Sequence, residues 1–332
     1  MRVRVGIASR PAWPAAAGVL FAHLPDPSES VRNLLALLRS GEIEPGGFFA
    51  ATDESGTVHS ATLAIPQPGG QGQLLPPASA DPEIEDQLVS AACGWLAGRG
   101  AKVTQVNLPE GEIRRGESLV RGGFRRVTRM LHLAVATGKA IPENESVLRL
   151  RPYAEIDAKR FAGVLISSYT DTLDCVELDG ARTSAEILAG YRGTAGRTPQ
   201  WFLAEVADEP AGVLLLSSGD RPDEREIAYL GIIPGFRRRG LGAALTRAAI
   251  RLAGAGGAMR LTLGVDERNG PAIRMYESQE FQLISRSDVY LKIGPGGRGP
   301  AAKESEESQS GARVETGGGS DAVGVATRPP TA

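Results

Sequence analysis

The chain has 332 residues, of which 42% are hydrophobic and 23% charged, and its 37 Lys and Arg nearly balance its 39 Asp and Glu. This length exceeds what one hydrophobic core usually organises, so two domains are expected, and the near-neutral charge argues against a general nucleic-acid binder. The only cysteines, Cys93 and Cys175, favour a reducing compartment and indicate no disulfide framework and no zinc site, although a disulfide between them stays open.

Charged residues at the N-terminus precede a mildly apolar stretch that Pro11 and Pro14 interrupt. A signal peptide or a membrane-spanning helix needs a longer uninterrupted apolar run. We therefore expect a cytoplasmic protein without a membrane partner.

Residues 1–137 are expected to form the first domain. Apolar residues recur there at helical spacing in some stretches and at strand spacing in others. In chain order, the predicted elements are helices over 14–24 and 31–38, a hairpin with strands 47–51 and 58–65, a Pro- and Gly-rich break over 66–77, a helix over 84–96, and strands over 102–108 and 128–135.

A polar linker over 138–146 leads to the second domain, which is expected over 147–293 and is followed by a tail over 294–332. The tail has no Leu, Ile or aromatic residue, so it is predicted to be disordered. The second domain begins with a predicted strand over 147–151, a helix over 156–167 and, after a loop, a helix over 183–191. That loop is acidic, which would favour a cationic amine or simply reflect exposure to solvent; its acidic residues are Asp171, Asp174, Glu177 and Asp179.

The stretch 226–243 has the pattern of a phosphate-binding turn. An apolar run over 227–233 predicts a strand that stops at Pro234, and apolar residues at helical spacing follow from Leu241. Between them lies a basic, Gly-containing loop. Free N–H groups at a helix start, the helix dipole and arginine side chains all favour an anion, although a solvated basic turn fits the same residues.

Three motifs in order resemble the GNAT superfamily of acyl-CoA-dependent N-acyltransferases. Arg237-Arg238-Arg239-Gly240-Leu241-Gly242 is similar to the family's Arg/Gln-x-x-Gly-x-Gly/Ala loop, and Leu230-Gly231-Ile232-Ile233-Pro234 is similar to its Leu-x-Val-x-Pro strand. Asn269 to Tyr276 resembles the Asn-x-x-Ala-x-x-x-Tyr segment, which Phe281 closes with Glu280 in place of the usual glycine. The likeness covers about 148–293.

The order of elements in the first half repeats that of the second, so the resemblance implies an α/β (α+β) protein of two tandem GNAT-like modules. Each would be a mixed, mostly antiparallel sheet flanked by helices. In the first module the basic loop is replaced by the Pro-rich stretch 75–82, which contains Asp81, and Leu119 stands at the position of Tyr276. Prolines lack N–H donors and an aspartate repels phosphate, so the first module is expected to be a degenerate copy.

The resemblance also implies a cofactor, acetyl-CoA, and an acceptor, a small-molecule or peptide amine, with no metal. The implied cofactor contacts are Ile232, Ile233, Arg237, Arg238, Arg239, Gly240, Leu241, Gly242, Ala243 and Asn269. A backbone N–H near Ile232 would polarise the thioester carbonyl. Asn269 is also expected to cap the helix that starts at Pro271.

Direct attack of the amine on the thioester needs a proton donor and a base. Tyr276 is the candidate general acid, with a packed core aromatic as the alternative. Glu226 is the candidate base, with a strand-end glutamate paired to arginine as the alternative and Glu205 in reserve. Cys175 is a conceivable nucleophile but has no local histidine. A non-catalytic acyl-CoA-binding or regulatory module is the alternative function, and the acceptor, the acyl length and the oligomeric state stay open.

Overall fold

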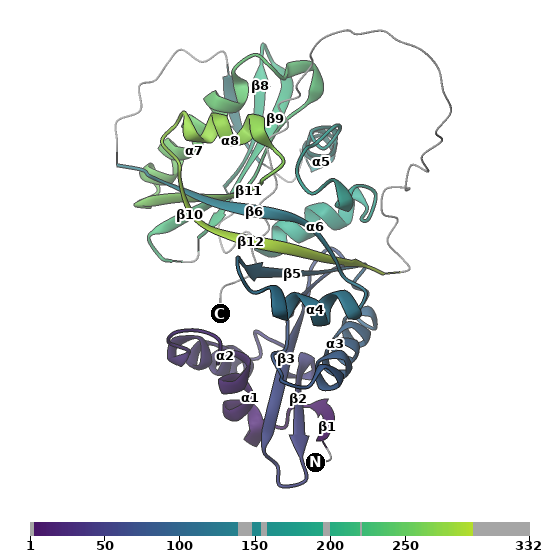
Figure 1. Cartoon of the computed structure of the whole chain (residues 1–332). Helices are drawn as coiled ribbons and strands as arrows, with labels where there is room; N and C mark the ends of the chain where they lie inside the picture. The colour runs from purple at the N-terminus through teal and green to yellow at the C-terminus, as the bar shows by residue number, and fades with distance from the viewer. Residues whose placement is uncertain (1–2, 139–147, 154–157, 195–199, 220, 295–332) are drawn as a thin grey trace, which may run out of the picture. The chain divides into compact units, whose positions relative to one another are not determined.

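The structure is a computed structural model that describes residues 3–138, 148–153, 158–194, 200–219 and 221–294 (Figure 1). The predicted linker and tail therefore lie outside the described residues, apart from Gly138 and Gly294. The described chain divides into two compact units. The first consists of residues 3–129 and 286–294, and the second lies within residues 130–285.

The sheet of the first unit follows the order β1-β2-β3-β4-β5-β12. Its strands are β1 (Val3–Ile7), β2 (Phe48–Asp53), β3 (Val58–Gln67), β4 (Gln71–Leu75), β5 (Val103–Pro109) and the part of β12 (Gln282–Ile293) that begins at Arg286. Only β4 and β5 pair in parallel. The helices are α1 (Trp13–Leu20), α2 (Ser28–Ser40), α3 (Pro82–Ala97) and α4 (Ile113–Arg121).

Helices cover both faces of this sheet, because alternate strand residues point to opposite sides. In β2, Phe48 and Ala50 pack in a core with α1 and α2, whereas Phe49 and Ala51 pack in a second core with α3 and α4. Figure 1 shows α1 and α2 on one side of β2 and β3, and α3 on the other. Burial of both faces explains why β2 reads as a short apolar run rather than as an alternating strand.

The second unit repeats this arrangement, with the strand order β6-β11-β10-β9-β8-β7. Its strands are the part of β6 (Arg125–Ala136) from Met130, β11 (Arg260–Asp266), β10 (Glu224–Ile232), β9 (Glu209–Ser218), β8 (Gln200–Val206) and β7 (Leu148–Pro152). Only β10 and β11 pair in parallel. The helices are α5 (Ala158–Ser167), α6 (Ser184–Thr194), α7 (Leu241–Ala255) and α8 (Gly270–Glu277).

The faces of the second sheet also separate two cores. Leu214 of β9 and Leu230 of β10 pack with α7 and α8. Leu215 of β9 and Tyr229 of β10 pack with α5 and α6. The predicted α/β class with two repeated modules is confirmed, since β4-α3-β5-α4 and β10-α7-β11-α8 have the same order.

In the first half of the chain, two strands and one α-helix escaped the sequence prediction. Strand β4 lies inside the predicted break over 66–77, and β1 and α4 were not predicted at all. The short segment Gln71–Leu75 has no strong strand pattern, and it becomes a strand because β3 and β5 pair with its two edges. This is a case of tertiary context overriding weak local propensity.

The compact units differ from the predicted contiguous domains 1–137 and 147–293. Residues 130–136 of β6 pair with β11 in the second unit, and β12 pairs with β5 in the first. Each unit therefore takes its last strand from the other half of the chain. The sequence contains no sign of this exchange, because a last strand has the same pattern whichever sheet it joins.

Candidate functional site

Strands β10 and β11 separate as they run toward their carboxyl ends. They are paired only where Glu224–Ile227 face Arg260–Leu263, although β10 continues to Ile232 and β11 to Asp266. A β-bulge in β10 falls between Ile227 and Tyr229, where the pairing stops. The result is a gap in the sheet at the carboxyl ends of two parallel strands, which is the place where open α/β sheets bind ligands.

The backbone of Ile232 faces this gap. The next residue, Ile233, donates its N–H to the Ala211 carbonyl of β9 at 2.9 Å. Because successive residues of a strand direct their backbone groups to opposite sides, the Ile232 N–H points away from β9. The Ile232 carbonyl also points that way and accepts a hydrogen bond from Arg237 Nε at 3.0 Å. This is the orientation that the predicted polarisation of a thioester carbonyl requires.

Helix α7 begins next to the gap with no side chain capping its N-terminus. Its N-cap, Gly240, has φ 74°, a conformation that suits glycine. The first intrahelical bond runs from the Ala244 N–H to the Gly240 carbonyl, so the N–H groups of Leu241, Gly242 and Ala243 have no acceptor in the helix. These residues line a pocket of about 100 Å³. The geometry is that of an anion-binding helix start.

The three arginines of the loop are used differently. Arg237 is held by backbone carbonyls, and it donates to those of Ile232, Ser168 and Thr170 at 3.0, 3.1 and 2.7 Å. Arg239 donates to a loop carbonyl and lies over the ring of Phe236. Arg237 therefore shapes the loop, whereas Arg238 and Arg239 are the exposed cations beside α7.

The equivalent helix start in the first unit is closed to an anion. Helix α3 begins at Pro82, and the Asp81 side chain accepts the Glu83 N–H at 2.9 Å. A protein carboxylate thus occupies the position that a phosphate would need, and the first turn adds two more acidic residues. In the same unit Leu119, at the position of Tyr276, is a fully buried core residue.

Tyr276 lies on α8, is 2% exposed, and packs its ring against Phe281 with the centroids 5.4 Å apart. Its hydroxyl group forms no hydrogen bond with any residue in the described part of the chain. Burial raises the pKa of the phenol well above its ordinary value, and Asp174 and Tyr229 raise it further. The phenol therefore stays protonated at neutral pH and has an unused donor.

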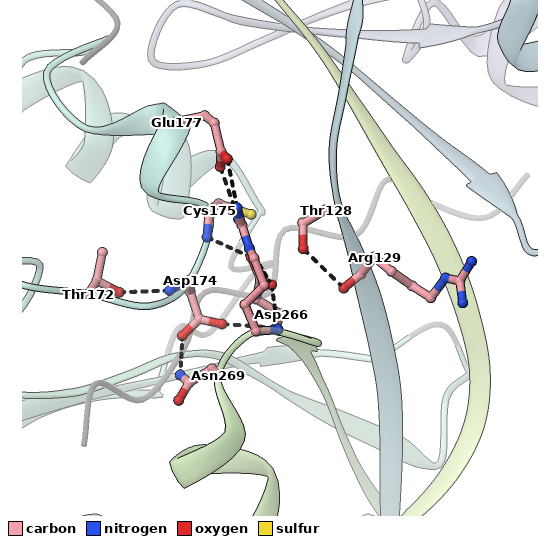
Figure 2. Close-up of polar contacts among 9 residues, drawn as sticks. Thr128, Arg129, Thr172, Asp174, Cys175, Glu177, Asp266 and Asn269 are labelled. Carbon is pink, nitrogen blue, oxygen red and sulfur yellow. Dashed lines mark hydrogen bonds and ion pairs between the residues drawn. The ribbon is translucent and has the colours of Figure 1, made fainter. Parts of the chain in front are cut away.

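The buried carboxylate of Asp174 connects the acidic loop to the start of α8 (Figure 2). Asn269 Nδ2 donates to Asp174 Oδ2 at 2.6 Å, and the Asp266 N–H donates to Oδ1 at 2.9 Å. Asn269 Oδ1 accepts the Ala272 N–H at 3.1 Å, so the predicted helix cap is present. Burial raises the pKa of Asp174 to about 7. Contact of Asn269 with a cofactor stays a prediction, since both ends of its amide are already engaged.

A second carboxylate, Asp266, fixes the acidic loop from the end of β11 (Figure 2). It accepts the Cys175 N–H at 3.0 Å and forms an ion pair with Arg268 at 2.7 Å. Arg268 also pairs with Glu177 at 2.7 Å, so it joins the loop to β11. The Cys175 thiol is buried and its pKa is raised well above the ordinary value, chiefly by burial, which makes it a poor nucleophile.

The two glutamates considered as bases have different surroundings. Glu226 is half-buried on β10 and accepts a hydrogen bond from Ser217 Oγ at 3.4 Å. Glu205 is 4% exposed and forms ion pairs with Arg160 at 3.1 Å and Arg151 at 3.6 Å. Two arginines already pair with the Glu205 carboxylate, so Glu226 stays the better candidate of the pair.

A larger pocket of about 460 Å³ lies between the end of α5 and the start of α6. Asp171 and Asp179 are exposed at its edge, whereas Asp174 is buried in its wall. Arg182 also lines it, and its Nε is buried with no hydrogen-bond partner in the described chain. Sequence reasoning recognised the acidic loop but missed Arg182, because nothing in a helix-start pattern distinguishes a buried arginine from an exposed one.

The described residues contain neither a metal-binding cluster nor a membrane-spanning helix. No group of three or more His, Cys, Asp or Glu side chains is arranged there to hold a metal ion. No helix in that part of the chain has both the length and the apolar content needed to cross a bilayer.

Comparison with known sequences identifies the same region. The model of the acetyltransferase (GNAT) family matches residues 169–281. The peptidyl-lysine N-acetyltransferase YjaB of Salmonella typhimurium is 34% identical over 91 residues, which is 27% of this chain and 55% of that protein. The match thus spans about half the length of this curated relative.

Comparison with solved structures extends the likeness to both units. A GCN5-related N-acetyltransferase from Sphaerobacter thermophilus is similar over 88% of this chain and 95% of its own, with a TM-score of 0.62 and 16% identity. A tandem GNAT protein from the clavulanic acid biosynthesis pathway is similar over 89% of this chain and 99% of its own, with a TM-score of 0.53 and 14% identity. At such identities the likeness concerns the fold alone.

Proposed function

We propose that this chain transfers an acetyl group from acetyl-CoA to a primary amine, because the model of the acetyltransferase (GNAT) family matches residues 169–281. The observation that carries the proposal is the gap between β10 and β11 beside the uncapped start of α7. An extended, amide-containing arm that ends in a pyrophosphate fits both features. The arm would pair with the free edge of β10, and the pyrophosphate would meet the N–H groups at 241–243.

The chain's own groups supply the remaining chemistry. The Ile232 N–H would stabilise negative charge on the thioester oxygen, and the Tyr276 phenol would give its proton to the leaving sulfur. As the C–N bond forms and the C–S bond breaks, the attacking ammonium loses two protons in all. One replaces the proton that Tyr276 gave to sulfur, and a carboxylate takes the other and passes it to solvent.

Glu226 is our first candidate for that carboxylate, and the structure suggests Asp174 as a second. Asp174 lines the larger pocket and has a pKa of about 7, close to the value that a base working at neutral pH needs. It also acts electrostatically on Tyr276, which indicates that the two side chains are near each other. The larger pocket would then hold the acceptor amine.

The alternative is a non-catalytic acyl-CoA-binding or regulatory module. It would use the same gap and helix start, but it would need neither an unpaired phenol at Tyr276 nor a second pocket beside Asp174. Tight acetyl-CoA binding with no acetyl transfer to any amine would favour this alternative.

Calorimetric titration with acetyl-CoA tests the proposal. We expect one site per chain for the wild type, and binding about 10- to 100-fold weaker for Gly242→Asp, because its carboxylate would repel the pyrophosphate at short range. Gly242→Ala adds a side chain without charge, and Gly94→Asp adds a charge to an exposed position of α3 where no atom lies within 4 Å. Both controls should bind normally.

Two results would contradict the proposal. Two sites per chain would show that the first unit is not degenerate, and equal affinity of Gly242→Asp and wild type would place the cofactor elsewhere. Free-thiol release with a panel of primary amines then decides between enzyme and binding module.

A further inference from the structure

Arg182 is a partly buried cation that forms no ion pair with the described residues. It lies just before α6, its Nε is buried and unpartnered, and its guanidinium forms no hydrogen bond or ion pair with any described residue. Glu186, the acidic residue that acts on it electrostatically, instead accepts hydrogen bonds from the N–H and Oγ1 of Thr183 at 2.8 and 3.0 Å. Because Arg182 is partly buried and its Nε is out of contact with water, its charge attracts an anion more strongly than a fully exposed arginine would, so we expect an anionic ligand group to bind there.

Arg182 lies in the wall of a pocket large enough for a small-molecule ligand. It lines the pocket of about 460 Å³, and the hydroxyl groups of Tyr169 and Tyr191, which bond each other at 2.8 Å, lie near it. Burial lowers the pKa of the guanidinium from its ordinary value, but an arginine keeps its charge at neutral pH nonetheless. The pocket volume is within the range of small-molecule sites.

The same pocket contains a buried group of the opposite charge. Asp174 is 2% exposed, and its two oxygens are held by Asn269 and by the Asp266 N–H. Several other titratable or charged groups interact electrostatically with Asp174. They are Asp266 of β11, Arg268 after β11, Tyr276 of α8, Tyr229 of β10, Tyr191 of α6 and Cys175 of the loop. The one cation of this set, Arg268, forms its ion pairs with Asp266 and Glu177 rather than with Asp174. The negative charge of the Asp174 carboxylate can therefore interact with a cationic group of a ligand.

We infer that the acceptor is a primary amine that also carries an anionic group, with its ammonium bound at Asp174 and its anion bound at Arg182. This deepens the proposed acetyl transfer and rests on it. An amine bound at Asp174 would lie near Tyr276, the candidate proton donor, because Asp174 interacts electrostatically with that phenol. The anion satisfies the cation that the protein leaves unpaired. The exposed Asp171 and Asp179 at the edge attract the ammonium group but, being in water, contribute weakly to selectivity.

Pairs of amines that differ only in an anionic group test whether the acceptor needs that group, independently of whether acetyl transfer occurs. We would compare kcat/KM for unbranched ω-amino acids with two to six carbons against that for alkylamines of equal chain length. The wild type should prefer an ω-amino acid over its matched alkylamine by at least about tenfold, the size expected for one charge-assisted pair. An ω-aminoalkyl phosphonate series tests whether carboxylate or phosphonate is the better anion.

The variants locate the preference. Arg182→Gln should abolish the preference, while Arg182→Lys should keep part of it. Arg149→Gln, which alters an exposed arginine of β7, should behave as wild type. Arg182→Gln removes a partly buried charge that has no ion pair among the described residues, so a thermal melt should show a folded protein of undiminished stability.

The outcomes are distinguishable from failure of the proposed function. If no amine of either series is acetylated although acetyl-CoA binds, acetyl transfer to such amines fails. If alkylamines are acetylated as well as ω-amino acids, or if Arg182→Gln keeps the preference, the inference about the anion is wrong. If Arg182→Gln instead weakens acetyl-CoA binding in the calorimeter, Arg182 serves the donor and the inference is also overturned.

Discussion

Removal of the Tyr276 hydroxyl should lower activity and leave stability nearly unchanged. The residue is 2% exposed, but its hydroxyl oxygen is not among the fully buried polar atoms that lack a hydrogen-bond partner, so it keeps contact with solvent. Tyr276→Phe therefore removes no uncompensated polar group, and it keeps the ring contact with Phe281. The free energy of unfolding should change by less than about 0.5 kcal/mol.

The effect of Tyr276→Phe on catalysis should be large. If the phenol protonates the leaving sulfur, its loss should lower kcat by about 10²- to 10⁴-fold, the usual contribution of a general acid. Thiol release with saturating acetyl-CoA measures kcat, and differential scanning calorimetry of the same preparation measures stability. A packed core tyrosine without a catalytic role would show no fall in kcat.

Tyr229→Phe is the matched control. Tyr229 is as deeply buried, but its hydroxyl forms a 2.7 Å hydrogen bond with Ser168 Oγ. Removing it should lower stability by about 1 kcal/mol, the net worth of a typical hydrogen bond. The reasoning is refuted if both variants lose stability alike, or if Tyr276→Phe keeps full kcat.

Two further predictions concern stability. Burial raises the pKa of Asp174 to about 7 in the folded protein, whereas in the unfolded chain it has its ordinary pKa of about 4. Between these two pH values the folded protein keeps a proton on Asp174 that the unfolded chain has lost. Asp174 therefore lowers stability as pH rises through that window, and melting curves of Asp174→Asn should show less of this decline; an unchanged pH dependence would contradict the assignment. A Cβ at Gly231 would lie 2.5 Å from both Ser168 Oγ and Tyr229 Oη, so Gly231→Ala should reduce the free energy of unfolding by about 1–3 kcal/mol. Denaturant titration measures this, and Gly235→Ala, where no atom lies within 4 Å, should show no comparable loss.

Much of the site was predictable because its requirements are local. A strand that ends at Pro234, a glycine at 240 and a helix from Leu241 are set by neighbouring residues, so motif and periodicity placed the α7 start correctly. The N-cap at Asn269 was predictable for the same reason. In the first unit, the sequence predicted that Asp81 would repel a phosphate, but the structure was needed to show that this carboxylate caps α3.

Tertiary structure alone decided the features that depend on distant partners. The strands β6 and β12 have ordinary strand sequences, and only pairing shows that β6 joins β11 and β12 joins β5. Charge in the acidic loop was visible in the sequence, but burial is a property of the surrounding elements. Burial raises the pKa of Asp174 and removes the Nε of Arg182 from water, because desolvation depends on the helices and strands packed around a side chain rather than on its neighbours in sequence.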